Sequence, residues 1–311
     1  MITPGYQALH DGAALTDLTG RGKIRLSGED RARLLHAMTT NHVNDLPVGH
    51  GLYAFFLNNQ GRILADVNIW NMGESFLLDT EASTAQLVFD HLDKFIIADD
   101  VTLNNETDTT ASISVDGPLS KAALEAAGFT VPLVNEIIEI NGIAISHNQS
   151  IMIFCPLREK GGLVARLHEA GVKDATSDDL LVYHLEQQRP TYGVDFSDKH
   201  IPQETNQMRA IHFTKGCYLG QEIVERVRSR GLVNRLLVPL SIEGTVVPAA
   251  ETEILSGEAR VGKITSAAFS PKVGKVLAYG FVRAEIVRNL AAPLLVGEAV
   301  AQVLKNSEGN V

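Results

Sequence analysis

The hydrophobic positions follow a helical spacing in some segments of the chain and form short extended runs in others. In "SGEDRARLLHAMTTN", the positions of Leu34, Leu35 and Met38 follow a helical spacing after several acidic residues. We expect Ser27 to cap this helix. Residues 51–80 contain three apolar runs rich in aromatic and β-branched residues, separated by "NNQG" and "NMGE". A helix followed by a three-stranded antiparallel meander is therefore predicted.

The first α+β unit continues with another helix, and a second cycle of helices and strands begins at residue 118. The helical period returns in "STAQLVFDHLDKFII", where the predicted apolar face comprises Leu87, Val88, His91, Leu92 and Phe95. A short helix is predicted over 118–128, then extended segments around an "NG" turn, then a helix in "LVARLHEAG". A further helix begins near Ser177 and stops before Pro190. Helices that lie beside sheets, without strict strand–helix alternation, predict an α+β fold.

The pattern changes near residue 235. Short extended runs punctuated by Gly, Pro and Ser occupy residues 236–311, which indicates a small β-barrel domain. The preceding α+β region, residues 1–235, is predicted to form two lobes, roughly 1–115 and 116–235, with exchange of segments between them.

Composition narrows the classes of protein to consider. The chain has 311 residues, 45% hydrophobic and 21% charged, which is typical of a folded protein with two or three packed units. The formal net charge of −10 disfavours direct binding to nucleic acid or to an anionic membrane. No apolar run approaches the roughly 18 residues of a membrane span. Two cysteines and the lack of a visible leader favour the cytoplasm.

The segment "KGCYLGQEIVERVRSRG" holds the cysteine with the strongest chemical signal. Gly216 permits a tight turn, and the apolar spacing after it predicts a helix that begins close to Cys217. The positive end of that helix and the neighbouring Lys215 favour the thiolate, although a purely structural thiol fits the sequence equally. Cys155, in "IMIFCPL", is expected to be an inert core thiol.

Two arginines on the same predicted helix could bind an anion. Arg226 and Arg230 are four residues apart, so their guanidinium groups share a helical face. An exposed ion pair between Glu222 and Arg226 explains the same spacing without a ligand. His212 could pair with the thiol of the segment, but the spacing favours an ordinary solvated or hydrogen-bonded histidine. The spacing of Cys and His predicts no metal site.

The motif "KGCYLGQE" resembles that of the YgfZ-type folate-binding family. Members of this family are relatives of the glycine-cleavage T-protein, and its mitochondrial members assist iron–sulfur cluster assembly. The segments "FLNNQGRILADV", "LEQQRPTYGVDFSDKHIPQE" and "GKITSAAFSP" are similar to the family's hairpin, central segment and terminal barrel, in the same order. The resemblance implies a GcvT-like three-lobed ring with tetrahydrofolate, or a one-carbon derivative of it, in a central opening.

The resemblance also implies roles for individual residues. Glu186 matches a T-protein glutamate that contacts the pteridine, and a carboxylate can accept paired hydrogen bonds from pterin N–H groups. An i,i+3 pair with Arg189 is the alternative. T-proteins carry adjacent aspartates where this chain has Ala65 and Asp66, so the departure puts aminomethyl transfer in question. The motif cysteine, Cys217, matches YgfZ and not T-protein.

Three hypotheses for function follow from the resemblance. The first is a tetrahydrofolate-binding accessory protein for iron–sulfur cluster synthesis or repair, with Cys217 as the working thiol. Its partners would be reduced folate and iron–sulfur assembly or client proteins, with an indirect effect on tRNA modification. Lys215, Arg226 and Arg230 would favour the thiolate or hold the glutamate tail of folate. The second is a folate-dependent aminomethyltransferase or demethylase that uses Asp66. The third is a noncatalytic folate sensor.

Overall fold

The computed structural model describes residues 2–231, 233–289 and 293–305, and for Arg230 only the backbone. The chain divides into two units, each considered by itself. The first unit comprises Met1–Leu57, Leu64–Leu180 and Arg209–Leu219, and the second comprises Asn58–Ile63, Leu181–Met208 and Gly220–Val311.

The first unit contains a five-stranded antiparallel sheet. Its strand order is β3-β4-β5-β2-β6, with β2 (Gly22–Ser27), β3 (Gly51–Leu57), β4 (Ile63–Asn71), β5 (Ser75–Thr80) and β6 (Thr102–Asn105). Two helices, α2 (Arg31–Met38) and α3 (Ala85–Asp93), contribute Leu35 and Val88 to the core of this sheet. The consecutive neighbours β3, β4 and β5 are the predicted meander.

A second sheet in the same unit has six strands. Its order is β11-β1-β7-β10-β9-β8, with β1 (Ala14–Asp17), β7 (Thr110–Asp116), β8 (Glu136–Ile140), β9 (Ile143–His147), β10 (Ile151–Pro156) and β11 (Lys173–Asp174). Its helices are α1 (Pro4–Asp11), α4 (Ser120–Ala126) and α5 (Lys160–Glu169). The N-terminal strand β1 pairs with β7, which follows the strands of the first sheet in the chain. The strand β7 pairs on its other side with β10, so it belongs to the second sheet.

The two sheets share an apolar cluster. Trp70 and Leu77, from β4 and β5, pack with Ile137, Ala144 and Phe154 of the second sheet. Backbone hydrogen bonds from Gly51 and Ile137 also join the sheets, since their N–H groups donate to the carbonyls of Asn135 and Gly49. The first sheet is therefore packed against the second. Its strand β4 carries the residue on which the candidate site is centred.

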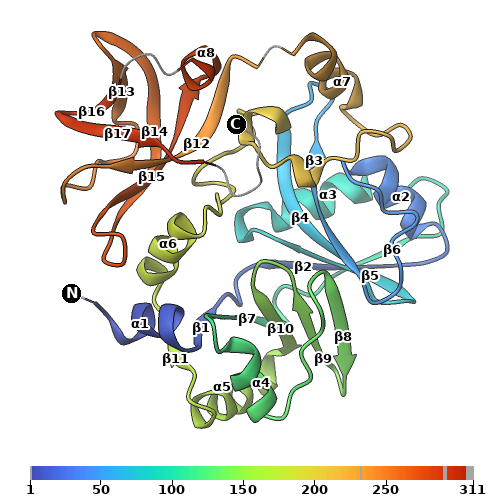
Figure 1. Cartoon of the computed structure of the whole chain (residues 1–311). Coiled ribbons are helices and arrows are strands. Elements are labelled where there is room, and N and C mark those ends of the chain that lie inside the picture. The colour runs from blue at the N-terminus through green and yellow to red at the C-terminus, as the bar shows by residue number, and fades with distance from the viewer. Residues whose placement is uncertain (1, 232, 290–292, 306–311) are drawn as a thin grey trace. The chain divides into compact units, whose positions relative to one another are not determined.

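The second unit contains a closed barrel (Figure 1). Its strand order is β12-β15-β14-β13-β16-β17, with β12 (Arg235–Ile242), β13 (Glu253–Ser256), β14 (Ala259–Ser270), β15 (Lys275–Arg283), β16 (Leu294–Val296) and β17 (Ala299–Val303). The helices of this unit are α7 (Gln221–Arg230), α8 (Ala284–Arg288) and the larger part of α6 (Ser177–Glu186). Short 3₁₀ helices occur at Ala82–Thr84, Leu157–Glu159, Pro202–Thr205 and Met208–Ala210.

The tip of the β3–β4 hairpin belongs to the second unit. Gly61 has a φ of +68°, and a Cβ there would lie 2.7 Å from the Cβ of Ile223 on α7. The N–H of Ile63 donates to the carbonyl of His200 at 3.0 Å. A glycine is therefore required at the turn both for its backbone conformation and for the close approach of the helix.

The α+β fold with a C-terminal barrel is confirmed, while one helix boundary is wrong. Ser27 is the last residue of β2, and α2 begins at Arg31 after Asp30. Gly28, with a φ of +102°, separates the strand from the helix, and a Cβ on it would collide with the carbonyl of Asp100. Within the part of the chain that the structure describes, no helix has the length and apolar character needed to cross a membrane.

Candidate active site

Asp66 lies on β4 and is 8% exposed. Its Oδ2 accepts a hydrogen bond from the hydroxyl of Tyr53 on β3 at 3.0 Å. Its Oδ1 is buried and has no hydrogen-bond partner among the described residues. A buried acceptor without a donor costs free energy in a protein, so such an atom is a candidate for contact with a ligand.

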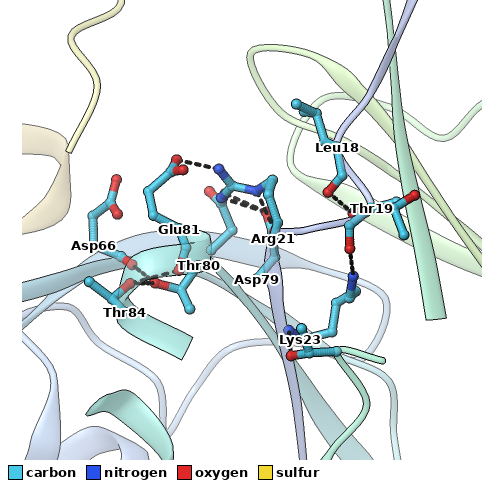
Figure 2. A network of polar contacts seen from close by, with 12 residues as sticks. Leu18, Thr19, Arg21, Lys23, Asp66, Asp79, Thr80, Glu81 and Thr84 are labelled. Carbon is cyan, nitrogen blue, oxygen red and sulfur yellow. Dashed lines mark hydrogen bonds and ion pairs between the residues drawn. The ribbon is translucent and has the colours of Figure 1, made fainter. Parts of the chain in front are cut away.

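Two further carboxylates surround this aspartate (Figure 2). Glu81 and Asp79 both form ion pairs with Arg21, whose Nε lies 2.7 Å from Oδ1 of Asp79. Burial, followed by the charge of Glu81, raises the pKa of Asp66 to about 7, and Asp79 adds to the rise, while Arg21 and the Tyr53 hydroxyl oppose it. Near neutral pH the Asp66 carboxyl can therefore either hold or release a proton.

Tyr53 is held by neighbours from separate parts of the first unit. The guanidinium of Arg209 lies over its ring, 4.5 Å from the centroid. The Asn41 side chain donates to the carbonyls of both Tyr53 and Arg209, at 2.9 and 3.0 Å. Burial and the charge of Asp66 raise the pKa of Tyr53 well above its usual value. The phenol thus stays protonated and can donate to Asp66.

Lys215 is buried and binds backbone carbonyls. It is 4% exposed, and its Nζ donates to the carbonyls of His36, Thr39 and Asn41, each at 2.6 Å. Burial lowers the pKa of Lys215 to about 7, although three carbonyl acceptors favour the ammonium form. All three N–H donors of an ammonium are used by these carbonyls. These contacts engage its three donors, and the roles of Lys215 in favouring a thiolate or holding a folate tail stay predictions.

We expect Lys215→Met to destabilise the protein by roughly 3 kcal/mol, because three buried or partly buried carbonyls lose their donor. Urea denaturation measures the free energy of unfolding. The matched control is Lys121→Met, whose side chain is 59% exposed and lies 3.9 Å from Glu125. Equal effects of the two substitutions would show that the carbonyl contacts of Lys215 do not stabilise the fold.

Cys217 is a free, exposed thiol, whereas Cys155 is 1% exposed, as expected. Cys217 lies in a segment that is anchored on both sides: the Thr40 hydroxyl donates to the carbonyl of Ala210 at 2.6 Å, and the N–H of Leu219 donates to the carbonyl of Ala37. The helix α7 begins only at Gln221, after Tyr218, Leu219 and Gly220. The helix predicted close after Cys217 is confirmed, but Tyr218, Leu219 and Gly220 separate the thiol from its first turn.

His212 lies beside other histidines. Its ring centroid is 5.1 Å from that of His42, which in turn lies 4.6 Å from that of His36. The backbone N–H of His212 donates to the carbonyl of Thr40 at 3.0 Å. Among the residues that the structure describes, no group of three or more His, Cys, Asp or Glu side chains could hold a metal ion.

The remaining candidates lie in the second unit. Glu186 is the last residue of α6, and its Oε1 accepts a hydrogen bond from the Ser270 hydroxyl at 2.6 Å. Arg226 on α7 forms an ion pair with Glu222, the alternative that the spacing allowed. The side chain of Arg230 lies outside the described residues. Glu186 and Arg226 thus each have a contact within the second unit. Their roles toward folate stay predictions.

Comparison with known proteins identifies the family. The GCVT N-terminal domain model matches residues 1–138, and the glycine cleavage T-protein C-terminal barrel domain model matches residues 235–304. The glycine cleavage system aminomethyltransferase T of Bartonella henselae has the same fold, with a TM-score of 0.91 over 99% of this chain and 89% of its own at 19% identity. The chain belongs to the GcvT-like superfamily.

Several members of the GcvT-like superfamily are similar along most of the chain. The aminomethyltransferase of Rubrobacter xylanophilus is 27% identical, over 91% of this chain and 80% of its own. That of Streptomyces avermitilis is 28% identical, over 90% and 80%. A putative chloroplastic transferase of Arabidopsis thaliana is 25% identical, over 96% and 71%. Assignment to the YgfZ-type branch of the superfamily stays a prediction.

The sequence pointed to Asp66 but not to its neighbours within this GcvT-like fold. Tyr53 belongs to the strand next to that of Asp66 in the hairpin, and its contact depends on strand register. Arg21 precedes β2, and it meets Asp79 and Glu81 only because β2 and β5 pair. The sequence predicts β5 as a strand of the meander but predicts no strand at β2, so the pairing of the two was not foreseen.

Proposed function

We propose that this protein is a tetrahydrofolate-dependent one-carbon transferase of the aminomethyltransferase kind, in which Asp66 positions the reacting amine. The observation that carries the proposal is the buried Asp66 carboxyl with one oxygen, Oδ1, lacking a donor among the described residues. Similarity to aminomethyltransferases over about nine-tenths of the chain supports it.

The surroundings of Asp66 fit an amine. Tyr53 occupies Oδ2 and fixes the carboxyl, so a ligand N–H can donate to Oδ1. A charge-assisted hydrogen bond there would satisfy the buried acceptor. With a pKa raised to about 7, Asp66 can also take up a proton from an amine or return it near neutral pH. The chain therefore both orients the amine and accepts its proton at one atom, Oδ1 of Asp66.

Residues of the second unit would hold the folate. Glu186 would accept hydrogen bonds from the pterin N–H groups, as the resemblance implies, while Ser270 steadies one of its oxygens. Arg226 would bind the glutamate tail, since its exposed pair with Glu222 is weak enough to exchange for another carboxylate. When bound, tetrahydrofolate supplies the nitrogen that accepts the one-carbon unit.

A second candidate function rests on Cys217. Its exposure and lack of a disulfide partner leave the thiol accessible to an iron–sulfur cluster or a sulfur donor. In this alternative the protein is a folate-binding accessory factor that acts on iron–sulfur client proteins and affects tRNA modification indirectly. The two candidates differ in which residue is essential, Asp66 or Cys217.

Titration with tetrahydrofolate tests the folate part of both candidates. We expect Glu186→Ala to weaken binding by about 10- to 100-fold, since it removes charge-assisted hydrogen bonds to the pterin. Cys217→Ala should leave the affinity nearly unchanged, as should the control Glu125→Ala on the exposed face of α4. Isothermal calorimetry of the full chain provides the dissociation constants.

Two results would contradict this assignment. If the parent protein binds no tetrahydrofolate, both candidate functions lose their cofactor. If the parent, Glu186→Ala and Cys217→Ala bind it equally, Glu186 is not the pterin ligand and the division of roles between the two residues is wrong.

A further inference from the structure

A pocket of about 550 Å³ lies within the second unit, and no residue of the Asp66 cluster lines it. It is formed by the loop at residues 193–200 together with β12, β14, β15 and the turn at Ala250 and Glu251. Its lysines and arginines are Lys199, Arg235, Arg260, Lys263 and Arg283. A local excess of positive charge in a chain of net charge −10 requires an explanation.

Two of the arginines are placed against each other. Arg235 on β12 and Arg283 on β15 are direct partners in the antiparallel register, so their side chains lie on the same face of the barrel wall. Like charges at directly opposed positions destabilise a sheet. Glu204 accounts for the charge of Arg235, but Arg283 has only an exposed partner, so this arrangement points to an anion that binds between the two arginines.

The carboxylates that pair with these lysines and arginines leave most of them available to bind a ligand. Lys263 pairs with Glu251, and Arg260 with Glu253, but the four side chains are 44% to 72% exposed. Exposed pairs of this kind contribute little and exchange readily with a ligand. Arg235 differs, because it contacts both oxygens of Glu204, whose side chain is 12% exposed. Arg235 is therefore a fixed part of the pocket wall.

The Arg283 pair is looser still. Its guanidinium lies 4.0 Å from the carboxylate of Glu285, and the two side chains are 57% and 73% exposed. Lys199 has no ion pair among the described residues, and its carbonyl accepts from Arg235 at 3.2 Å. At Arg283 and Lys199, an incoming anion therefore meets little competition from carboxylates of the chain.

A histidine and a buried aspartate also line the pocket. His200 stacks on Phe281 with the ring centroids 4.2 Å apart, and burial together with Arg235 lowers its pKa, which keeps it neutral at pH 7. Asp195 is 3% exposed and accepts hydrogen bonds from the hydroxyls of Thr265 and Ser266, at 2.8 and 2.6 Å. These contacts hold the loop rigidly on the barrel.

We propose that this pocket is a binding site for a small oligoanion, a molecule that carries two or more adjacent phosphate or carboxylate groups. Guanidinium groups bind both kinds of oxyanion in a bidentate geometry. The volume accommodates a ligand of small-molecule size. The site belongs to the barrel unit and does not depend on the function proposed for Asp66.

Calorimetric titration of the full chain at low ionic strength tests the site. The two probes are inorganic tripolyphosphate and tri-γ-glutamate, which separate a phosphate ligand from a carboxylate ligand. We expect at least one probe to bind, and Arg260→Gln/Arg283→Gln to weaken that binding by about tenfold or more, since two charge-assisted contacts are lost. Added salt should weaken binding to the parent protein.

Arg158→Gln is the control, because that arginine is 83% exposed and belongs to the first unit. Lys199→Gln provides a second, milder variant, which should also weaken binding. Without a probe, Arg283→Gln alone should melt no earlier than the parent, because it removes the repulsion from Arg235. The inference is overturned if neither probe binds the parent, or if the parent and the double variant bind equally.

Discussion

Asp66→Asn is expected to abolish folate-dependent transfer. Asparagine keeps the size of the side chain but cannot accept a proton, and its amide is a poorer acceptor for an amine than a carboxylate. Loss of a positioned proton acceptor and of a charge-assisted contact reduces turnover by roughly a hundredfold or more. The rate at which tetrahydrofolate is converted in the presence of an aminomethyl donor measures the effect.

The same substitution should stabilise the folded protein above pH 7. The pKa of Asp66 is raised from 3.8 to about 7 in the folded state, so between these values the native state binds more protons than the unfolded chain. Stability therefore falls as pH rises through this window, and the penalty is complete above it. Asparagine carries no charge at any pH, so the variant should gain on the order of 2–4 kcal/mol at pH 8 and little at pH 4.

Cys217→Ala separates the two candidate functions. It should leave the transfer rate unchanged if Asp66 acts as proposed, because the exposed thiol has no part in that chemistry. Full transfer activity in Asp66→Asn would refute the proposal. A loss of iron–sulfur enzyme activity in cells that carry Cys217→Ala, together with normal function of Asp66→Asn, would favour the accessory role. Normal function of both variants with intact folate binding would leave a noncatalytic folate protein.

Local sequence signals predicted the elements well where a single residue determines the geometry. The "NG" turn joins β8 and β9, with Asn141 and Gly142 at φ of 53° and 77°, as a two-residue hairpin requires. The apolar face predicted for α3 is only partly buried: Val88 is fully buried, while Leu87 is 41% exposed and Phe95 is 36% exposed. Phe95 fails because the helix ends at Asp93, which the period alone did not indicate.

The candidate site was less accessible to sequence reasoning, because its contacts join distant segments. Lys215 reaches carbonyls that lie more than 170 residues earlier in the chain. In the sequence, a lysine two residues before a cysteine predicts a cation near a thiol. Only the packing of the 209–219 segment on the α2–β3 connection brings the Lys215 side chain to backbone carbonyls. The position of Asp66 came from the family resemblance, whereas its raised pKa comes first from burial and then from the charge of Glu81, the residue that follows β5.

Arg21→Met is expected to destabilise the protein by about 3–5 kcal/mol, because it leaves two carboxylates without their cation. The Arg21 side chain is 17% exposed and contacts both oxygens of Asp79, at 2.7 and 3.2 Å, as well as Glu81. Asp79 is 2% exposed, and its remaining side-chain donor in the described network is Asn68, at 3.1 Å. Methionine fills much of the volume, so the loss reports mainly the missing charge. Urea denaturation at pH 7 measures it.

The matched comparison is Arg33→Met, which removes an arginine that also bridges two aspartates but is 65% exposed. Solvent screens those charges, so its midpoint should stay close to that of the parent. The double variant Arg21→Met/Asp79→Asn should recover a substantial part of the loss, since the uncompensated buried carboxylate is gone. If the second substitution restores nothing, the cost of Arg21→Met arises from lost packing and not from the buried charges that also set the proton affinity of Asp66.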